Sequence, residues 1–284
     1  MRPLRVLTLN LWGAQAPLAR RMALIADGIA ALAPDVVALQ EVQERTAASP
    51  PLPNQAESLG KATGFAHVFA PAVAFAGGHE GVALLSRLPV LAHEARPLPH
   101  ATADEARVVL SVALDLGAVA DGKTPLWVHT THLNYRLGHG RQREDQVIAV
   151  EAELAARPDS VPQILLGDFN ARPESDEIRW LTGLTTLAGR RTLLQDAWAR
   201  RHPHAPGWTW AAANPYTAPL AFLQPDRRLD YIFVTPERRD GRGRVHDCRI
   251  VLDRPAEDGV YPSDHFGLLA EIQVTADPAP PALP

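Results

Sequence analysis

Cysteine is almost absent from this chain of 284 residues, in which Cys248 is the single thiol. One thiol cannot close an internal disulfide, so the fold does not depend on an oxidising compartment. Long apolar runs are missing too. None approaches the ~20 residues that a membrane-spanning helix needs, and the N-terminal segment shows no secretory signal pattern. These absences predict a cytoplasmic protein without a membrane span.

Lysine is equally scarce, with only Lys61 and Lys123, and the formal net charge is −4. Proteins that hold long duplex DNA carry continuous basic surfaces that neutralise its phosphates. The composition therefore disfavours a general nuclease. It leaves nucleic acid open as an alternative substrate, because a local cluster of arginines can serve a short contact with phosphate groups. No feature of the sequence indicates an oligomeric state.

Short apolar segments alternate with segments of helical periodicity along most of the chain. The spacing of apolar residues predicts helices over 18–33 and 141–157. Strand-like segments are 4–12, 35–42, 81–87, 106–116, 126–133, 163–169, 229–234, 248–253 and 266–274. Several of these follow one another through short turns, unlike the strand–helix units of an eightfold barrel. The pattern predicts an α/β fold, namely a four-layer sandwich of two packed mixed or antiparallel sheets flanked by helices. The barrel is the alternative.

The distribution of proline and alanine predicts the limits of the folded part. We expect one domain over residues 1–275. The tail 276–284 is rich in Pro and Ala and has few side chains to pack, so we expect it to be disordered. Residues 203–225 are rich in Pro, Trp and Ala, and we expect them to form a long surface loop.

Polar side chains recur at the ends of otherwise apolar strands. Carboxylates and amides are costly in an apolar interior unless they are paired or bind a metal. Their number at strand ends therefore predicts one shared polar pocket. Oxygen ligands without a cysteine cluster favour Mg²⁺ or Mn²⁺ over structural zinc. The residues concerned are Asn10, Glu41, His132, Asn134, Asp168, Asn170, Asp230, Asp264 and His265.

Seven short segments give the sequence a recognisable pattern. They are TLNLWG (8–13), LQEVQ (39–43), EGVALLSR (80–87), THLN (131–134), GDFNARPES (167–175), LDYIFV (229–234) and SDHFGL (263–268). Each alone is a weak signal. In this order, over nearly the whole chain, they resemble the endonuclease/exonuclease/phosphatase superfamily, the metal-dependent phosphoesterases that include deoxyribonuclease I.

The resemblance implies a metal site made by three of these residues. Glu41 would be the principal ligand, assisted by Asn10, with Asp264 as a further metal-site or histidine-supporting carboxylate. The cofactor would be Mg²⁺ or Mn²⁺. Glu80 matches an acidic residue that supports the histidine in some members of the family. Apart from the resemblance, Asn10 could merely cap a turn and Glu41 could be a solvated charge.

The resemblance also implies catalytic roles. Asp168 would orient and partly deprotonate the attacking water, and Asn170 would hold a phosphate oxygen. His265, kept in one tautomer by Asp230, would carry a proton or act as a cation, and His132 would donate to another oxygen. Such groups suit the chemistry, because a phosphodiester must have its negative charge offset before a nucleophile can attack. The alternatives are an ion pair of Asp230 with a neighbouring arginine and a purely structural His132.

Three further residues are candidates for binding substrate. Arg107 stands where many members place a phosphate-contacting or structural arginine. Asn134 and Arg136 belong to the segment after the predicted strand 126–133, and Arg141 and Arg143 follow. Guanidinium groups match phosphate geometry, so this group could contact the far side of the substrate. It could equally be the solvated start of a helix.

Aromatic residues in the long loop could also bear on the substrate. Trp208, Trp210 and Tyr216 could stack on a base or cover an apolar leaving group. They could equally form a small satellite core. His129 and Cys248 are expected to be structural.

These observations favour a metal-dependent phosphodiesterase that acts on a small or medium-sized phosphate ester. TLNLWG looks like the opening of the sphingomyelinase-type branch, which keeps a lipid-like substrate among the candidates. The main alternative is an endonuclease or exonuclease acting on DNA or RNA. A non-catalytic binding module is disfavoured because every metal and histidine position is occupied. A serine hydrolase is disfavoured because the sequence has no G-x-S-x-G segment.

Overall fold

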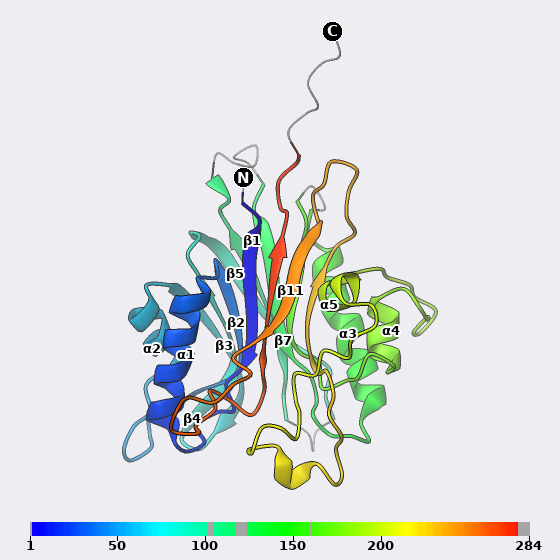
Figure 1. Cartoon of the computed structure of the whole chain (residues 1–284). Helices are drawn as coiled ribbons and strands as arrows, with labels where there is room; N and C mark the ends of the chain where they lie inside the picture. The colour runs from blue at the N-terminus through cyan, green and yellow to red at the C-terminus, as the bar shows by residue number, and fades with distance from the viewer. Residues whose placement is uncertain (1, 102–104, 118–123, 159–160, 278–284) are drawn as a thin grey trace.

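A computed structural model describes residues 2–101, 105–117, 124–158 and 161–277. Two six-stranded sheets pack against each other, and helices cover their outer faces, so that the molecule has four layers (Figure 1). This arrangement confirms the predicted α/β sandwich and excludes the barrel. Among the described residues, no helix is long and apolar enough to cross a membrane.

The first sheet has the strand order β11-β12-β1-β2-β4-β3. Its strands are β1 (Leu4–Asn10), β2 (Val36–Glu44), β3 (Ala66–Phe75), β4 (Gly78–Ser86), β11 (Val245–Val251) and β12 (Gly267–Ile272). Strands β1 and β2 are parallel, and the other neighbours are antiparallel. The helices on its outer face are α1 (Leu18–Leu32) and α2 (Gln55–Thr63) (Figure 1).

The second sheet has the order β5-β6-β7-β8-β10-β9. Its strands are β5 (Val90–Pro97), β6 (Val108–Leu114), β7 (Leu126–His132), β8 (Ile164–Asp168), β9 (Gln195–Asp196) and β10 (Asp230–Val234). Here β7 and β8 are the parallel pair. The helices on this side are α3 (Gly140–Ala155), α4 (Asp176–Leu181) and α5 (Ala197–Arg201) (Figure 1).

Alternation along the strands explains the layers. In β1, Val6 lies in the core between the sheets, whereas Leu7 and Leu9 lie in the core under α1 and α2. A third core, which includes Leu165 and Phe169, lies under α3 and α4. Both faces of each sheet are covered by other layers, so these apolar side chains are fully buried. Burial of each one contributes roughly 1.5–3 kcal/mol. Continuous apolar strands are the sequence signature of such sheets.

The two parallel strand pairs bring polar ends together. Asn10 of β1 is in register with Gln40 of β2, and His132 of β7 is in register with Asp168 of β8. Parallel neighbours end at the same edge of a sheet, so each sheet presents its polar strand ends at one edge. The packing of the sheets then places both edges at the same end of the molecule.

The strands that the sequence did not predict lie at sheet edges or next to them. Strand β3 carries Pro71, which lacks a backbone N–H for the ladder, and the register shifts between Pro71 and Val73. Proline is confined to edges and bulges of sheets, and β3 is the edge strand of the first sheet. Strand β5, at the edge of the second sheet, is mostly exposed. Edge strands therefore lack the apolar pattern by which buried strands were predicted.

The predicted loop lies wholly within the described residues, whereas the tail predicted to be disordered lies only partly within them. The loop over 203–225 holds one short 3-10 helix, η2 (Ala218–Leu220), and otherwise turns. Of the tail predicted to be disordered, Asp277 accepts a hydrogen bond from Gln273 and pairs with Arg244. Residues 278–284 lie outside the described residues, and the single domain over 1–275 stays a prediction.

Candidate active site

Asn10 joins the two sheets at their polar ends. Its Nδ2 donates to Oδ2 of Asp168 across 3.0 Å and to Oε1 of Glu41 across 3.1 Å. Its Oδ1 accepts from the backbone N–H of Trp12 at 2.9 Å, so the amide is held in one orientation. Two carboxylates from different sheets are thus linked through one side chain, as a shared pocket requires.

His132 presents an N–H to Asp168. The Nη1 of Arg107 lies 3.0 Å from Nδ1 of His132, and an arginine can only donate, so Nδ1 is the acceptor. The proton of the neutral ring is then on Nε2, which lies 3.5 Å from Oδ2 of Asp168. Burial, together with repulsion from Arg107 and His265, holds the pKa of His132 well below its usual value. His132 is therefore a neutral hydrogen-bond donor.

His265 has the opposite electrostatic state. Its Nδ1 lies 2.8 Å from Oδ2 of Asp230, and its Nε2 lies 3.8 Å from Oδ2 of Asp168. Burial alone would lower the pKa of His265, but Asp230, Asp168 and Asp264 together raise it well above its usual value. His265 is thus an imidazolium held by Asp230, which also stands opposite Asp168 in the ladder between β10 and β8.

Asp168 lies at the centre of these donors. Its Oδ1 accepts from the backbone N–H of Asn170 at 2.9 Å. Burial raises the pKa of Asp168 to about 6, with Asp230 adding to the rise and His265 opposing it. Asp168 is therefore a carboxylate near neutral pH but a stronger base than a solvated aspartate. Asn170 adopts a φ of 47°, and its Nδ2 donates to the carbonyl of Leu133 at 3.1 Å.

Glu41 sits at an irregularity in β2. The register with β4 shifts between Leu39 and Val42, and Glu41 has a φ of 53°, a left-handed conformation uncommon for this residue type. Bulges of this kind redirect side chains next to functional sites. Burial raises the pKa of Glu41 to about 8, and repulsion from Asp264 and Glu80 adds to the rise.

Glu41, Asp264 and Glu80 form an acidic group, in which Asp264 and Glu80 repel the charge of Glu41. Burial also raises the pKa of Asp264, so this acidic group lacks sufficient compensating charge. Glu80 is tied to Nε2 of Gln43 at 2.6 Å, which leaves Glu41 and Asp264 as the principal oxygen donors. Bound Mg²⁺ or Mn²⁺ would supply the missing positive charge.

A second group within the description could also hold a metal. One ligand atom each from Asp168, Asp230 and His265 lie within 4.8 Å of one another. These residues were predicted to be catalytic rather than metal-binding. A metal ligand must be deprotonated, whereas His265 retains its proton between two carboxylates. His265 would have to lose that proton before this group could bind a metal, and Glu41, with a pKa of about 8, would have to lose its own.

A sequence profile of the Endonuclease/Exonuclease/phosphatase family matches residues 7–265. The chain belongs to this family. Tyrosyl-DNA phosphodiesterase 2 of Mus musculus is 26% identical over 249 residues, which are 87% of this chain and 59% of that protein. This chain thus spans less than two thirds of the length of that relative.

Solved structures of other proteins have the same fold. A D. rerio TDP2 complexed with single-strand DNA product has a TM-score of 0.73 and 22% identity, covering 94% of this chain and 97% of that one. An endonuclease/exonuclease/phosphatase from Beutenbergia cavernae has a TM-score of 0.72 and 26% identity, covering 99% and 74%. Enzymes of the endonuclease/exonuclease/phosphatase family are metal-dependent phosphoester hydrolases, in agreement with the carboxylates and histidines gathered here.

In this family member, Arg21 is a buried residue of the site that the sequence did not reveal. From α1 it donates to the carbonyls of five residues and so fixes the segments on both sides of the acidic group. The acceptors are Leu11, Trp12, Gly13, Gln15 and Pro262. Arg21 lies one and two turns before the buried Ile25 and Ile29. A charge on an apolar helix face was the signal available.

The predicted substrate-binding residues lie in different surroundings. Arg107 is buried against His132, so it orients that ring. Asn134 is buried, and its Oδ1 accepts from the backbone N–H of Arg136. Arg143 is buried in an ion pair with Glu177 at 2.8 Å and supports the start of α3. Arg136 is exposed, with its guanidinium 5.5 Å from the ring of Tyr135.

The aromatic residues of the long loop belong to two environments. Tyr216 stacks on Trp12 with ring centroids 4.4 Å apart, next to the acidic group. Trp210 is buried, whereas Trp208 is 47% exposed. Asn214 donates to the carbonyls of Ser263 and Asp264. The loop is therefore anchored to the segment that carries His265.

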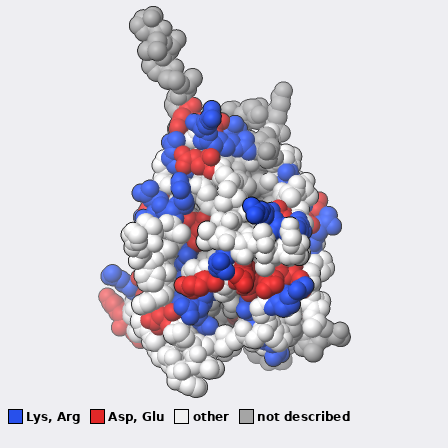
Figure 2. All heavy atoms as spheres, turned by 90° about the vertical axis from the view of Figure 1, so that its right-hand side faces the viewer, with Lys and Arg blue, Asp and Glu red and all other residues white. Residues whose placement is uncertain are grey.

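The outer surface beside α3, α4 and α5 does not carry a continuous basic area. Basic and acidic side chains are interspersed on this face (Figure 2), and several form pairs such as Arg179–Asp176 and Arg190–Glu151. This distribution agrees with the expectation from the net charge.

Proposed function

We propose that the protein is a divalent-metal-dependent phosphodiesterase that uses Asp168 as its base. The observation that carries the proposal is the pair of hydrogen bonds from Asn10 to Asp168 and Glu41. It links the base to the acidic group in one buried centre. His132 and His265 flank the same carboxylate. A basic carboxylate, a neutral hydrogen-bond donor and an imidazolium therefore face one small volume.

The side chains divide the chemistry among them. Asp168, with a pKa of about 6, accepts a proton from the attacking water at neutral pH. His132 donates its Nε2–H to a phosphate oxygen, and the His265 imidazolium faces the charge that develops on the phosphorus oxygens. Asp230 keeps that imidazolium protonated. Preorganised groups of this kind each contribute roughly 10²–10³-fold to kcat.

Glu41 and Asp264 would hold the cation, with Asn10 positioning Glu41. A bound Mg²⁺ or Mn²⁺ would offset phosphate charge and lower the pKa of a bound water. Glu41 must lose its proton to bind a cation, so binding competes with protonation.

A small or medium-sized phosphodiester is the leading substrate class, and nucleic acid is the second candidate. The second candidate is supported by similarity to a tyrosyl-DNA phosphodiesterase and to a TDP2 that was solved with single-strand DNA product. It is also supported by two arginines beside the catalytic centre, Arg172 and Arg227. The net charge of −4 speaks against long duplex DNA.

The test is hydrolysis of a set of substrates with Mg²⁺, Mn²⁺ or EDTA. The set contains bis-p-nitrophenyl phosphate, p-nitrophenyl phosphate, sphingomyelin, plasmid DNA and a single-stranded oligonucleotide. We expect metal-dependent cleavage of at least one diester, faster than of the monoester, and its loss in Asp168→Asn. Asp247→Asn, at a surface aspartate that pairs with Arg249, is the matched control. Diester cleavage that persists in EDTA, or in folded Asp168→Asn, would refute the proposal.

A further inference from the structure

Arg227 is a half-buried arginine next to the candidate active site. Its Nε is buried without a hydrogen bond, and within the described part of the chain its guanidinium forms no ion pair. The Nε of the neighbouring Arg228 is also buried without a hydrogen bond, but the guanidinium of Arg228 pairs with Asp196 at 2.6 Å. Burying an unpaired charge is costly, so Arg227 lacks the compensation that its neighbour has.

The position of Arg227 is fixed beside the catalytic centre. Beyond the paired Asp168 and Asp230, the ladder continues with the N–H of Phe169 donating to the carbonyl of Leu229 at 2.8 Å. The hydroxyl of Tyr231 then donates to the carbonyls of Ala171 and Arg228. The chain segments that carry Arg172 and Arg227 are thereby tied together just outside the active site.

The guanidinium of Arg227 is also held in place. It lies over the ring of Trp210, 4.5 Å from the centroid, and the backbones of Arg227 and Trp210 exchange hydrogen bonds. Burial lowers the pKa of Arg227, while attraction to Asp168 opposes this and repulsion from Arg172 adds to it. Arg227 thus interacts electrostatically with both the proposed base, Asp168, and a second arginine, Arg172.

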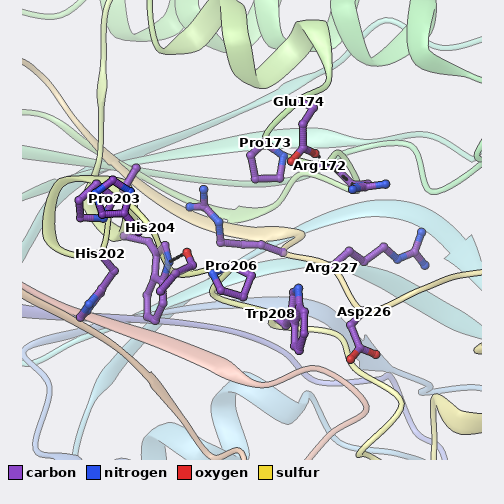
Figure 3. A pocket seen from close by; sticks show the side chains of 14 residues that line it. Arg172, Pro173, Glu174, His202, Pro203, His204, Pro206, Trp208, Asp226 and Arg227 are labelled. Atoms are coloured by element: carbon purple, nitrogen blue, oxygen red, sulfur yellow. Dashed lines mark hydrogen bonds and ion pairs between the residues drawn. The ribbon is translucent and has the colours of Figure 1, made fainter.

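A cavity of about 410 Å³ opens at this point. Arg172 and Arg227 contribute to its lining, as do Trp208 and Pro206 (Figure 3). In the figure the side chains of Arg172 and Arg227 extend to the same side, and Trp208 lies below Arg227. Arg172 pairs with Glu174 only at the surface, at 3.3 Å with both side chains more than half exposed, an interaction that contributes little.

We propose that Arg227, together with Arg172, binds a second phosphate group of the substrate, adjacent to the phosphate that is hydrolysed. Trp208 would contact a planar organic group of the same substrate. This inference rests on the proposed function, because it takes Asp168 as the reaction centre. The second phosphate would come from the next nucleotide of a strand or from a pyrophosphate. Arginine suits it, since a planar guanidinium can donate two parallel hydrogen bonds to phosphate.

Three chromogenic substrates separate these sources. The first is the p-nitrophenyl ester of thymidine 5′-phosphate, the second is the same compound with a 3′-phosphate, and the third is the p-nitrophenyl ester of thymidine 5′-diphosphate. We expect one of the last two to have a kcat/KM about tenfold above that of the first. Which of them does so identifies a strand or a pyrophosphate as the source.

Arg227→Gln tests the residue itself. It should reduce the preference for the second phosphate about tenfold. Arg227→Lys, which keeps the positive charge without the planar guanidinium, should retain part of the preference. Arg190→Gln, which removes an arginine paired with Glu151 on the outer surface, should leave the preference unchanged. A wild-type protein without a preference, or a preference that survives in folded Arg227→Gln, overturns the proposal.

Binding keeps the test decisive if none of the substrates is hydrolysed. The dissociation constants of thymidine 3′,5′-bisphosphate, thymidine 5′-diphosphate and thymidine 5′-monophosphate are then measured by calorimetry with Mn²⁺. At least one of the compounds with two phosphates should bind about tenfold more tightly than the monophosphate in the wild type but not in Arg227→Gln. Failure of hydrolysis with this pattern intact counts against the proposed function alone. Equal affinities in the wild type count against the subsite.

Discussion

Arg107 donates a hydrogen bond to Nδ1 of His132 across 3.0 Å and thereby fixes the tautomer of that ring. The two residues are 25 positions apart in the sequence and come from β7 and from the segment just before β6. Because Nδ1 is occupied, Nε2 carries the proton and faces Asp168. We therefore expect Arg107 to act on the proposed reaction through His132.

Removal of Arg107 should weaken catalysis through the histidine. Arg107→Met should lower kcat on the best diester roughly tenfold, and His132→Ala should lower it ~10²–10³-fold. Because Arg107 acts through His132, the double variant should be no slower than His132→Ala. Steady-state kinetics of the four proteins give the coupling. Fully additive losses would contradict this relationship.

Glu41→Gln should abolish stabilisation by metal. We expect Mn²⁺ or Mg²⁺ to raise the melting temperature of the wild type relative to EDTA, and to have little effect on Glu41→Gln. The pKa of Glu41 is about 8 in the folded state and near 4.5 unfolded. In EDTA, stability from this group is therefore complete below pH 4.5 and is lost as the pH rises towards 8. Glu41→Gln should show a smaller loss over that range.

Scanning calorimetry at several pH values checks both effects. Glu44→Gln, on the same strand, serves as the control for a lost carboxylate and should respond to metal as the wild type does. An equal metal response in Glu41→Gln and the wild type would place the cation elsewhere, with the group of Asp168, Asp230 and His265 as the first candidate.

His129 should make the protein sensitive to acid. It is buried in the second sheet between Ser111 and Gln163, and burial lowers its pKa to about 4. The unfolded chain binds a proton near pH 6.5 and the folded one does not, so stability falls as the pH drops from 6.5 to 4. The contribution is about 3 kcal/mol. Urea unfolding at pH 7, 5.5 and 4.5 measures it, and a slope equally steep in folded His129→Gln would sink the assignment.

Arg21 should be essential for stability near the metal group. Arg21→Met leaves several buried carbonyls without donors, at a cost on the order of 3–5 kcal/mol. Arg20→Met is the matched control, because Arg20 is exposed and pairs with Asp258 at the surface, and it should cost less than about 1 kcal/mol. Equal denaturation midpoints for the two variants would contradict the structural role of Arg21.

The buried part of the fold follows directly from the sequence. Continuous apolar segments gave β1, β2, β6, β7, β8, β10 and β12 to within a few residues, because strands covered on both faces need apolar side chains at nearly every position. The edge strand β3 escaped notice because Pro71 interrupts it and because an edge requires less apolar surface. The short helices α4 and α5 escaped because five or six residues carry too little periodicity.

The sequence by itself determined which polar residues end the buried strands, since an isolated Asp168 or Glu41 after an apolar run calls for a partner or a metal. Only the tertiary structure decided their partners. Asn10 reaches Asp168 across 158 positions, and the contact exists because two sheets pack with their polar edges together. In the one-dimensional pattern Arg227 is an ordinary charge, Arg21 is a charge on an apolar helix face, and Arg107 stands out only through the family resemblance. Burial and the identity of the nearest acceptor, both properties of the packed molecule, distinguish these arginines. Arg107 fixes a histidine tautomer and Arg21 binds backbone carbonyls, whereas Arg227 forms no ion pair within the described residues.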